Sequence, residues 1–346
     1  MKTASRIGIC LFLLSLTQIL SASDACSRRS IVTSADVTVS DGSAFVTESF
    51  FQSKSAAAIR HIRDKDQTVA VEGPYGWARV DGSEKLGSDF EKTFALGHQF
   101  HAFLLYFEEI VSNTRDSEEI SFQGKEHQAL TGEYPHGGLV HLIAAEGGIH
   151  AQGLVFEFPE SEPIVDTFSD WRSLDHLEIP FQVEIDDGQR VFSYRYTSID
   201  MAPKTPLWFF EAVSPPSLDE VQVYRLHRQL LAAHCLGDAD MIARLSSRQV
   251  LSANNGTMVQ VTNPSIRDRF SELFKRLEYT AYYDIQTPTI EISEGSDLGW
   301  IGVNVRAVGV DDVQGTLFDN QWAWIMVVRK EHGKWLHAGN ASNLSQ

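Results

Sequence analysis

Four prolines between residues 203 and 216 separate two stretches of the chain whose apolar residues recur with different periods. Before them, from Asp66 to Asp200, short runs of alternating polar and apolar residues are separated by glycine turns, a pattern typical of antiparallel strands. After them, the apolar residues of 221–231 follow helical spacing. Because proline and turn residues interrupt both patterns, we place a domain boundary here, with residues 203–219 as a Pro-rich linker.

The part before the linker is expected to form one antiparallel sheet over residues 66–202, with about eight strands. Phenylalanines at helical spacing between Asp89 and Ile110, interrupted by Gly97, predict a helix that crosses this sheet. Residues 24–65 are expected to be a polar segment that precedes it.

The part after the linker, residues 220–346, is expected to be an α+β domain. Gly237 is well placed to end its first helix, Asp238 to cap a second, and Pro264 to open a third. Strands are expected in the remainder, over residues 281–292, 298–310, 318–329 and 334–341.

The order of short motifs in this C-terminal part resembles the SnoaL-like, nuclear-transport-factor-two-like superfamily of cone-shaped α+β domains. The motifs are Leu231-Ala232-Ala233, Gly237-Asp238-Ala239-Asp240, Asn255-Gly256, the helix 266–274, Pro288-Thr289-Ile290-Glu291-Ile292-Ser293, and Gly333-Lys334-Trp335. The resemblance implies three helices on a curved antiparallel sheet, around a tapered cavity that admits a small molecule. Family members include isomerases, cyclases, dehydratases and binding modules without chemistry, so the fold does not define the function.

The N-terminal sheet resembles the half-barrel of outer-membrane lipoprotein-sorting proteins. The residues that carry this likeness are Gly76-Trp77, Phe122-Gln123-Gly124-Lys125, Asp170-Trp171-Arg172, Ile179-Pro180-Phe181 and Asp187-Gly188. The resemblance implies an antiparallel β half-barrel with a crossing helix that shelters acyl chains.

The ketosteroid-isomerase branch of the C-terminal superfamily needs a tyrosine donor and a carboxylate base. Counted from Gly237, these positions fall on Leu230 and Asn254, and neither side chain can perform those roles. A second hypothesis makes His234 a general base, with Asp319 or Asp284 as its orienting or electrostatic partner. His234 lies on the apolar stripe of its helix, so a core histidine is the alternative interpretation.

Aromatic residues of the same domain are candidates to line a pocket for a flat ligand. Trp322 and Trp324 alternate onto one face of a strand, although packing against the helices would give the same pattern. The predicted pocket residues are Asn254, Tyr279, Tyr283, Trp300, Trp322 and Trp324.

No cofactor or metal site is expected from the sequence. His98 and His101 are three positions apart, but a third zinc ligand at a defined spacing is missing. Phosphate-binding loops, Gly-x-Ser-x-Gly elbows and Cys-x-x-Cys motifs do not occur in the sequence.

The first residues of the chain predict export. Lys2 and Arg6 precede an apolar run that begins at Ile7, and the small residues 21–23 provide a cleavage site, so residues 1–23 are expected to be a signal peptide. The alternatives are an N-terminal membrane anchor and a lipid anchor on Cys26. The protein is expected in the periplasm or secreted, where Cys26 and Cys235 can form a disulfide.

The formal net charge of −17 disfavours nucleic acid as a partner. No segment after the signal is long and apolar enough for a transmembrane helix, so an integral membrane protein is not expected. We therefore expect an exported protein that binds a small apolar or lipid-like ligand, with a homodimer through the C-terminal domain as a further possibility. The alternative function is a proton-transfer enzyme of the isomerase, cyclase or dehydratase type, acting in the C-terminal cone.

Overall fold

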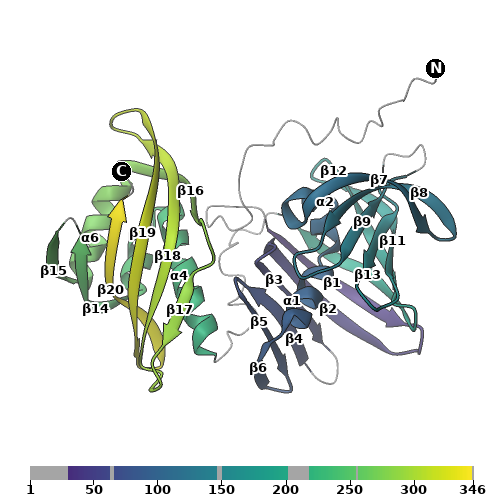
Figure 1. The fold of residues 1–346 in the computed structure, drawn as a ribbon, viewed down its shortest axis with the longest axis horizontal. Coiled ribbons are helices and arrows are strands. Elements are labelled where there is room, and N and C mark those ends of the chain that lie inside the picture. The colour runs from purple at the N-terminus through teal and green to yellow at the C-terminus, as the bar shows by residue number, and fades with distance from the viewer. Residues whose placement is uncertain (1–29, 63–65, 146–149, 202–217, 255, 345–346) are drawn as a thin grey trace. The chain divides into compact units, whose positions relative to one another are not determined.

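The computed structural model describes residues 30–62, 66–145, 150–201, 218–254 and 256–344, and Figure 1 shows its helices and strands. These residues form a mixed α+β structure with antiparallel sheets, as expected. They divide into two compact units: residues 38–43 and 103–195 form one, and the other described residues form the second. The predicted signal peptide and most of the predicted linker lie outside the described residues.

The N-terminal sheet contains 13 strands, more than the sequence predicted. In chain order they are β1 (Ile31–Val39), β2 (Ala44–Ser53), β3 (Ala56–Ile62), β4 (Asp66–Glu72), β5 (Tyr75–Val80), β6 (Ser83–Gly87), β7 (Ser112–Phe122), β8 (Lys125–Glu133), β9 (Leu139–Ile143), β10 (Gly153–Glu157), β11 (Ile164–Leu174), β12 (Leu177–Asp186) and β13 (Val191–Asp200). Their hydrogen-bonded order is β6-β5-β4-β3-β2-β1-β13-β12-β11-β10-β9-β8-β7. Strands β1 to β3 lie within residues 24–65, which were expected to form a polar segment.

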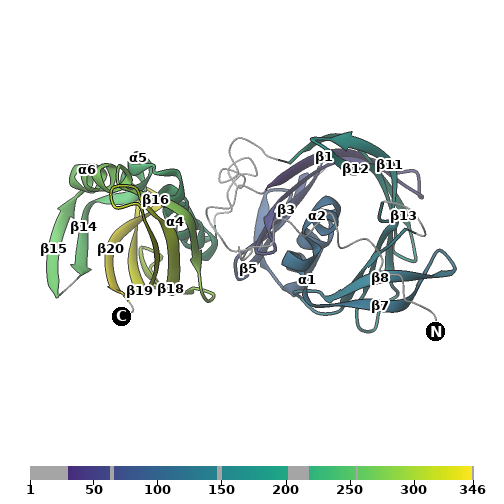
Figure 2. The same cartoon turned by 90° about the horizontal axis from the view of Figure 1, so that it is seen from above.

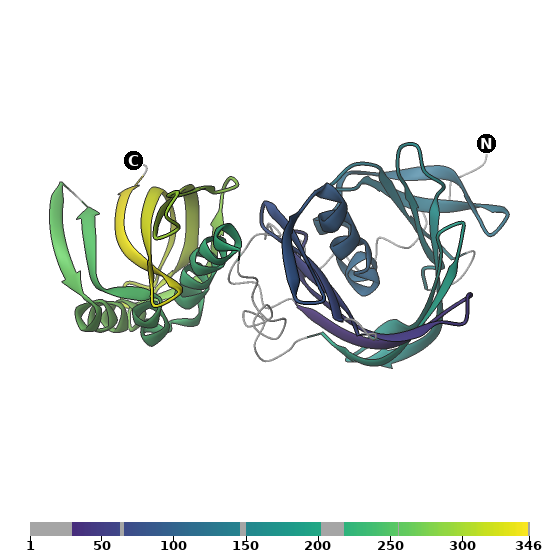
Figure 3. The same cartoon turned by 90° about the horizontal axis from the view of Figure 1, so that it is seen from below.

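The predicted crossing helix is two helices, α1 (Asp89–Gly97) and α2 (Phe100–Ile110). Ser88 and Glu91 form a capping box that fixes the start of α1. The helix ends at His98, whose Nδ1 lies 2.8 Å from the carbonyl oxygen of Phe94. Helix α1 packs on β3, β4 and β5, and Figure 3 shows it on the concave side of the first strands of the chain.

Helix α2 continues into the unit of residues 103–195. The Phe103 ring packs edge-on against Phe156 of β10, with ring centroids 5.4 Å apart, and stacks at 6.0 Å on Tyr134. Both Phe103 and Phe156 are buried. Figure 2 shows α2 on the concave side of the strands that follow it. This face of the sheet is therefore aromatic and covered by the helix.

The C-terminal part contains three helices and seven strands in the described residues. They are α4 (Asp219–Leu236), α5 (Ala239–Arg244), β14 (Ser246–Asn254), β15 (Thr257–Thr262), α6 (Asn263–Phe274), β16 (Leu277–Asp284), β17 (Thr289–Ile292), β18 (Leu298–Asp311), β19 (Thr316–Glu331) and β20 (Lys334–Leu344). The sequence did not predict the hairpin of β14 and β15.

Local signals in the sequence predicted the helix ends correctly. Gly237 closes α4 with φ of 63°, a left-handed conformation that favours glycine. The Asp238 side chain caps α5 by accepting a hydrogen bond from the Met241 backbone N–H at 2.7 Å. Pro264 lies in the first turn of α6.

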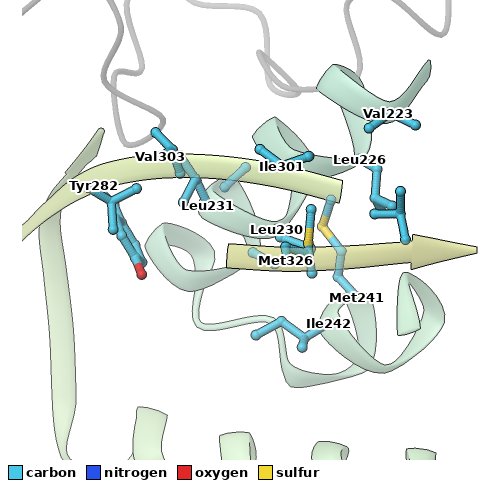
Figure 4. Close-up of a cluster of buried hydrophobic side chains, with 14 of the residues drawn as sticks. Val223, Leu226, Leu230, Leu231, Met241, Ile242, Tyr282, Ile301, Val303 and Met326 are labelled. Carbon is cyan, nitrogen blue, oxygen red and sulfur yellow. The ribbon is translucent and has the colours of Figure 1, made fainter. Parts of the chain in front are cut away.

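The seven strands form a second sheet in the order β15-β14-β20-β19-β18-β16, with β17 paired to β18. Neighbouring strands are antiparallel except β14 and β20, which run parallel. Alternate residues of β18 and β19 face the helices, and Figure 4 shows Ile301, Val303 and Met326 packed against Leu226 and Leu230 of α4. This cluster is the core of the C-terminal domain.

Within the described part of the chain, no helix has the length and apolar character needed to cross a membrane.

Candidate functional site

A histidine and an aspartate pair inside the C-terminal core. His227 Nε2 lies 2.7 Å from Asp284 Oδ1. His227 is 0% exposed and Asp284 is 8% exposed. The pair joins α4 to β16 across 57 residues of sequence.

The sequence places both residues on faces that point into the domain. His227 lies one turn before Leu230 and Leu231 on the buried stripe of α4. Asp284 ends β16 directly opposite Val305 of β18, a buried position that faces the helices. The ring of Trp324 lies 5.4 Å from the His227 ring.

The pair defines the proton positions of the imidazole. A carboxylate only accepts hydrogen bonds, so the proton of neutral His227 is on Nε2 and is donated to Asp284. This leaves Nδ1 as an acceptor. Nδ1 is buried and has no hydrogen-bond partner among the described residues. A buried acceptor without a partner costs about 1–3 kcal/mol, so it calls for an explanation.

His234, the base expected from the sequence, lies in a different environment. Its Nδ1 is 2.7 Å from the carbonyl oxygen of Leu230, in its own helix. Burial lowers the pKa of His234 to about 4. Its ring is surrounded edge-on by four aromatic rings, those of Phe270, Phe274, Tyr279 and Tyr282.

The two carboxylates expected beside His234 have other partners. Asp284 pairs with His227, as described above. Asp319 is half exposed and accepts a hydrogen bond from Arg306 Nε at 2.8 Å. That hydrogen bond lowers the pKa of Asp319. Asp284 therefore lies beside a histidine, but this histidine is His227 and not the predicted His234.

The predicted pocket aromatics divide between the two faces of the sheet. Tyr279, Trp322 and Trp324 are partly buried against the core on the side of the helices. Tyr283 and Trp300 point to the other face of the sheet, away from the helices. The Tyr283 hydroxyl accepts a hydrogen bond from Arg306, and Trp300 is 36% exposed. Three of the six predicted residues thus face the candidate site.

Asn254, the sixth predicted residue, ends β14 and ties it to β20. Its Oδ1 accepts hydrogen bonds from the Ser342 backbone N–H at 3.1 Å and from the Ser342 hydroxyl at 2.7 Å. Its side-chain amide donates to Ser252 at 2.8 Å. These contacts link neighbouring strands.

A glycine permits the aromatic packing at the far end of this face. Tyr279 and Phe318 pack edge-on at 5.5 Å on either side of Gly309, which is paired with both. A Cβ at Gly309 would lie 2.6 Å from the Phe318 ring and 2.1 Å from the Glu278 carbonyl oxygen. Burial raises the pKa of Tyr279 to about 12, so its hydroxyl is neutral at physiological pH.

The histidine pair of the N-terminal part does not share one helical face. His98 ends α1, whereas His101 is buried in α2. Among the residues that the structure describes, no group of three His, Cys, Asp or Glu side chains is arranged to hold a metal ion.

Cys235 is disulfide-bonded and partly buried beside the core. Cys26 lies outside the described residues, so the pairing of these two cysteines stays a prediction.

Comparison with solved structures finds NTF2-like proteins. An NTF2-like protein from Cytophaga hutchinsonii is 18% identical, covers 36% of this chain and 95% of its own, and has a TM-score of 0.31. A ketosteroid isomerase-like protein from Erwinia carotovora atroseptica is 11% identical, with coverages of 36% and 95% and a TM-score of 0.30. An NTF2-like protein from Rhodospirillum rubrum is 17% identical, with coverages of 35% and 96% and a TM-score of 0.30.

These similar structures thus include proteins of the NTF2-like superfamily that the sequence resembles, and at these identities and TM-scores the similarity implies no activity or ligand. No protein-family model matches the chain, and no curated protein matches it. The likeness of the N-terminal sheet to lipoprotein-sorting half-barrels stays a prediction.

His227 was not among the site residues predicted from the sequence. It lies two turns before His234 on the same helical stripe. That spacing was a usable signal, but the partner that distinguishes it, Asp284, comes from a distant strand.

Proposed function

We propose that the protein is exported and that its C-terminal domain binds a small, apolar or lipid-like molecule with one polar end. The polar end donates a hydrogen bond to His227 Nδ1. The observation that carries this proposal is that Nδ1 is buried, belongs to a ring whose Nε2 pairs with Asp284, and has no partner among the described residues.

The surroundings of His227 suit a ligand of this chemistry. Trp324 lies beside the ring, and Tyr279 and Trp322 are partly buried on the same side of the sheet. Small-molecule sites combine mostly apolar and aromatic lining with a few placed polar groups. A hydroxyl group on the ligand would supply the hydrogen bond that Nδ1 lacks.

Binding of 2-naphthol and naphthalene to the full chain tests this proposal. We expect 2-naphthol to bind about tenfold more tightly, since a hydrogen bond contributes about 1–1.5 kcal/mol. The preference should disappear in His227→Leu and persist in Asp319→Asn, a control in the same domain. Equal affinities for the two probes, or the same preference in His227→Leu, would refute it.

Native mass spectrometry of protein purified from its own compartment provides a second test. A co-purifying molecule that is largely apolar and carries one polar group would support the proposal. A strongly charged, fully polar molecule would contradict it.

Proton-transfer chemistry at the same pair is the second candidate function. A histidine whose second nitrogen is held by a carboxylate is the arrangement of a general base with an orienting group. In this version Nδ1 of His227 takes a proton from a carbon next to a substrate carbonyl, and Asp284 stabilises the imidazolium that forms. The base is then His227 instead of His234.

Deuterium exchange at the carbon beside the carbonyl of small cyclic ketones, followed by NMR, tests this candidate. The chain should accelerate exchange of at least one ketone. His227→Gln and Asp284→Asn should each lower the exchange rate by on the order of 10²-fold or more, which is the contribution expected of a general base. His234→Gln should leave it nearly unchanged. The absence of acceleration by the unaltered chain would remove the candidate.

The outer face of the second sheet supports a homodimer as a further part of the proposal. Ile325 and Trp300 are 53% and 36% exposed and lie on neighbouring strands, on the side away from the helices. Exposed apolar side chains in one patch are typical of interaction sites. Light scattering should detect a dimer that Ile325→Lys dissociates; a monomer at high micromolar concentration would contradict this part.

A further inference from the structure

A second buried group without a partner lies in the N-terminal sheet. Asp166 of β11 is 1% exposed, and neither of its carboxyl oxygens has a hydrogen-bond partner among the described residues. Aspartate is rarely buried in this way unless it is paired. This carboxyl group takes no part in the site of the C-terminal domain.

The sheet register gives Asp166 apolar neighbours. Leu154 of β10 and Ile185 of β12 lie directly opposite it, and both are buried. Phe168, two residues along β11, is on the same face because side chains alternate along a strand. Phe156, two residues from Leu154, is a diagonal neighbour on that face.

This is the face that α2 covers. Phe156 packs against Phe103 of α2 at 5.4 Å and against Tyr134 at 5.8 Å. The carboxyl group of Asp166 therefore belongs to an aromatic and aliphatic face on the concave side of these strands, as Figure 2 shows for the elements. Asp166 and all of these neighbours lie in the unit of residues 103–195.

Burial of this carboxyl group is unfavourable in the absence of a partner. Desolvation raises the pKa of Asp166 well above its usual range, so the group is driven to its neutral form. Even a neutral polar group costs free energy when it is buried without hydrogen bonds. A leucine, which branches at Cγ in the same way and has no polar atoms, would avoid this desolvation cost.

We propose that the concave face around Asp166 binds an apolar molecule that carries an amine, and that its ammonium group pairs with the two free oxygens of Asp166. This site is separate from the proposed function in the C-terminal domain. On binding, the carboxyl group releases its proton to solvent, and the carboxylate accepts charge-assisted hydrogen bonds from the ammonium N–H groups.

Three observations favour an amine over a neutral polar end. Both oxygens of Asp166 are unpaired, and an ammonium group has three donors to offer them. The rings of Phe156 and Phe168 lie on the same face, and aromatic rings attract cations. The net charge of −17 raises the local concentration of cationic ligands around the protein.

Isothermal titration of the full chain with octylamine and octan-1-ol tests the proposal, because the two probes share one apolar chain. Octylamine should bind at least tenfold more tightly, and Asp166→Asn should abolish this preference. Glu184→Gln, an exposed carboxylate on the other face of β12, is the matched control and should keep it.

A stability measurement separates a ligand site from a structural role. In Asp166→Leu the urea midpoint should rise and the preference for octylamine should be lost. A purely structural carboxyl group would instead be needed for stability, so its replacement would lower the midpoint. Loss of the isotope-edited infrared band of the protonated Asp166 carboxyl on addition of octylamine should follow the binding curve.

Equal affinities for the two probes, or an amine preference that survives in Asp166→Asn, would overturn the proposal. A lower urea midpoint in Asp166→Leu, with octylamine binding unchanged, would assign Asp166 to structure alone. The preference for 2-naphthol at His227 should be the same in Asp166→Asn, so failure of this proposal is distinguishable from failure of the proposed function.

Discussion

Three titratable side chains, two of them buried and His234 partly buried, differ in the hydrogen-bond partners that they have. His234 Nδ1 is paired with a backbone carbonyl oxygen, and His227 is paired with a carboxylate through Nε2 alone. Asp166 has no hydrogen-bond partner in the described part of the chain. Because an unpaired buried polar group costs more free energy than a paired one, these differences separate structural from functional candidates. His234 belongs to the packing of the core, and the other two are candidates for ligand contact.

Asp284→Ala should lower the free energy of unfolding by about 3 kcal/mol, because it leaves the His227 ring buried with both nitrogens unpaired. Asp284→Asn, which keeps an acceptor for Nε2, should cost less. Urea denaturation followed by circular dichroism measures both. Asp319→Ala is the control: its ion pair with Arg306 is exposed, and the midpoint should hardly move. Equal losses for the two alanine variants would contradict the buried pair.

The stability of the chain should fall in part through His234 as the pH is lowered. Its folded pKa of about 4 is below the usual value of 6.5, so between these values the unfolded state binds the proton and the folded state does not. The contribution of His234 to the free energy of unfolding is therefore complete above pH 6.5 and is lost as the pH falls towards 4.

His234→Gln should therefore flatten the pH dependence by about 1–2 kcal/mol between pH 7 and pH 5. Denaturation at each pH gives this slope, and His176→Gln, at an exposed position, is the control. A slope that His234→Gln leaves unaltered would show that the imidazole is already accessible to protons in the folded state.

At the scale of the element, the strands of the second sheet are adapted to the aromatic rings between them. The register of β16 with β18 shifts between Tyr279 and Ala281, so that Tyr279, Tyr282 and Asp284 can all face the helices. Tyr279 and Tyr282 then stack at 5.6 Å. This bulge re-aims side chains next to the candidate site.

Gly309→Ala should destabilise the chain by about 1–3 kcal/mol, because the new methyl group overlaps the Glu278 carbonyl oxygen and the Phe318 ring. Gly302→Ala, on the same strand, meets only the outer atoms of the Trp300 ring, which can move, and should be milder. Thermal unfolding compares the two variants. If Gly302→Ala is the more harmful, the close packing at Gly309 is wrong.

Local features were predictable from sequence where a single residue determines them, as Gly237, Asp238 and Pro264 do for the helix ends. Strands β1 and β2 were not, because their buried face carries hydroxyl groups: Thr33 and Ser49 pair at 2.6 Å inside the sheet. A polar residue that is buried and satisfied cannot be distinguished by pattern from one in solvent. The His227–Asp284 pair was not predicted for a different reason, since only the fold brings its two residues together.

At the scale of the whole molecule, the proposed export and the disulfide of Cys235 are linked through the redox conditions of the compartment. A disulfide requires an oxidising compartment, which the predicted signal peptide would supply. Non-reducing peptide mapping should link the peptides that contain Cys26 and Cys235, and reduction should lower the unfolding temperature, because a crosslink that closes a long loop restricts the unfolded chain. A free Cys26 thiol in exported protein would contradict the pairing.

Strand β20 lies between β14 and β19, although it is the last of the three in the sequence. During synthesis β14 therefore lacks its neighbour β20 until residues 334–344 have been made. In the N-terminal sheet β1 likewise borders β13, so the earliest strand waits for the thirteenth. In both sheets, therefore, a strand made early gains one of its neighbours only after the last strand of that sheet has been synthesised.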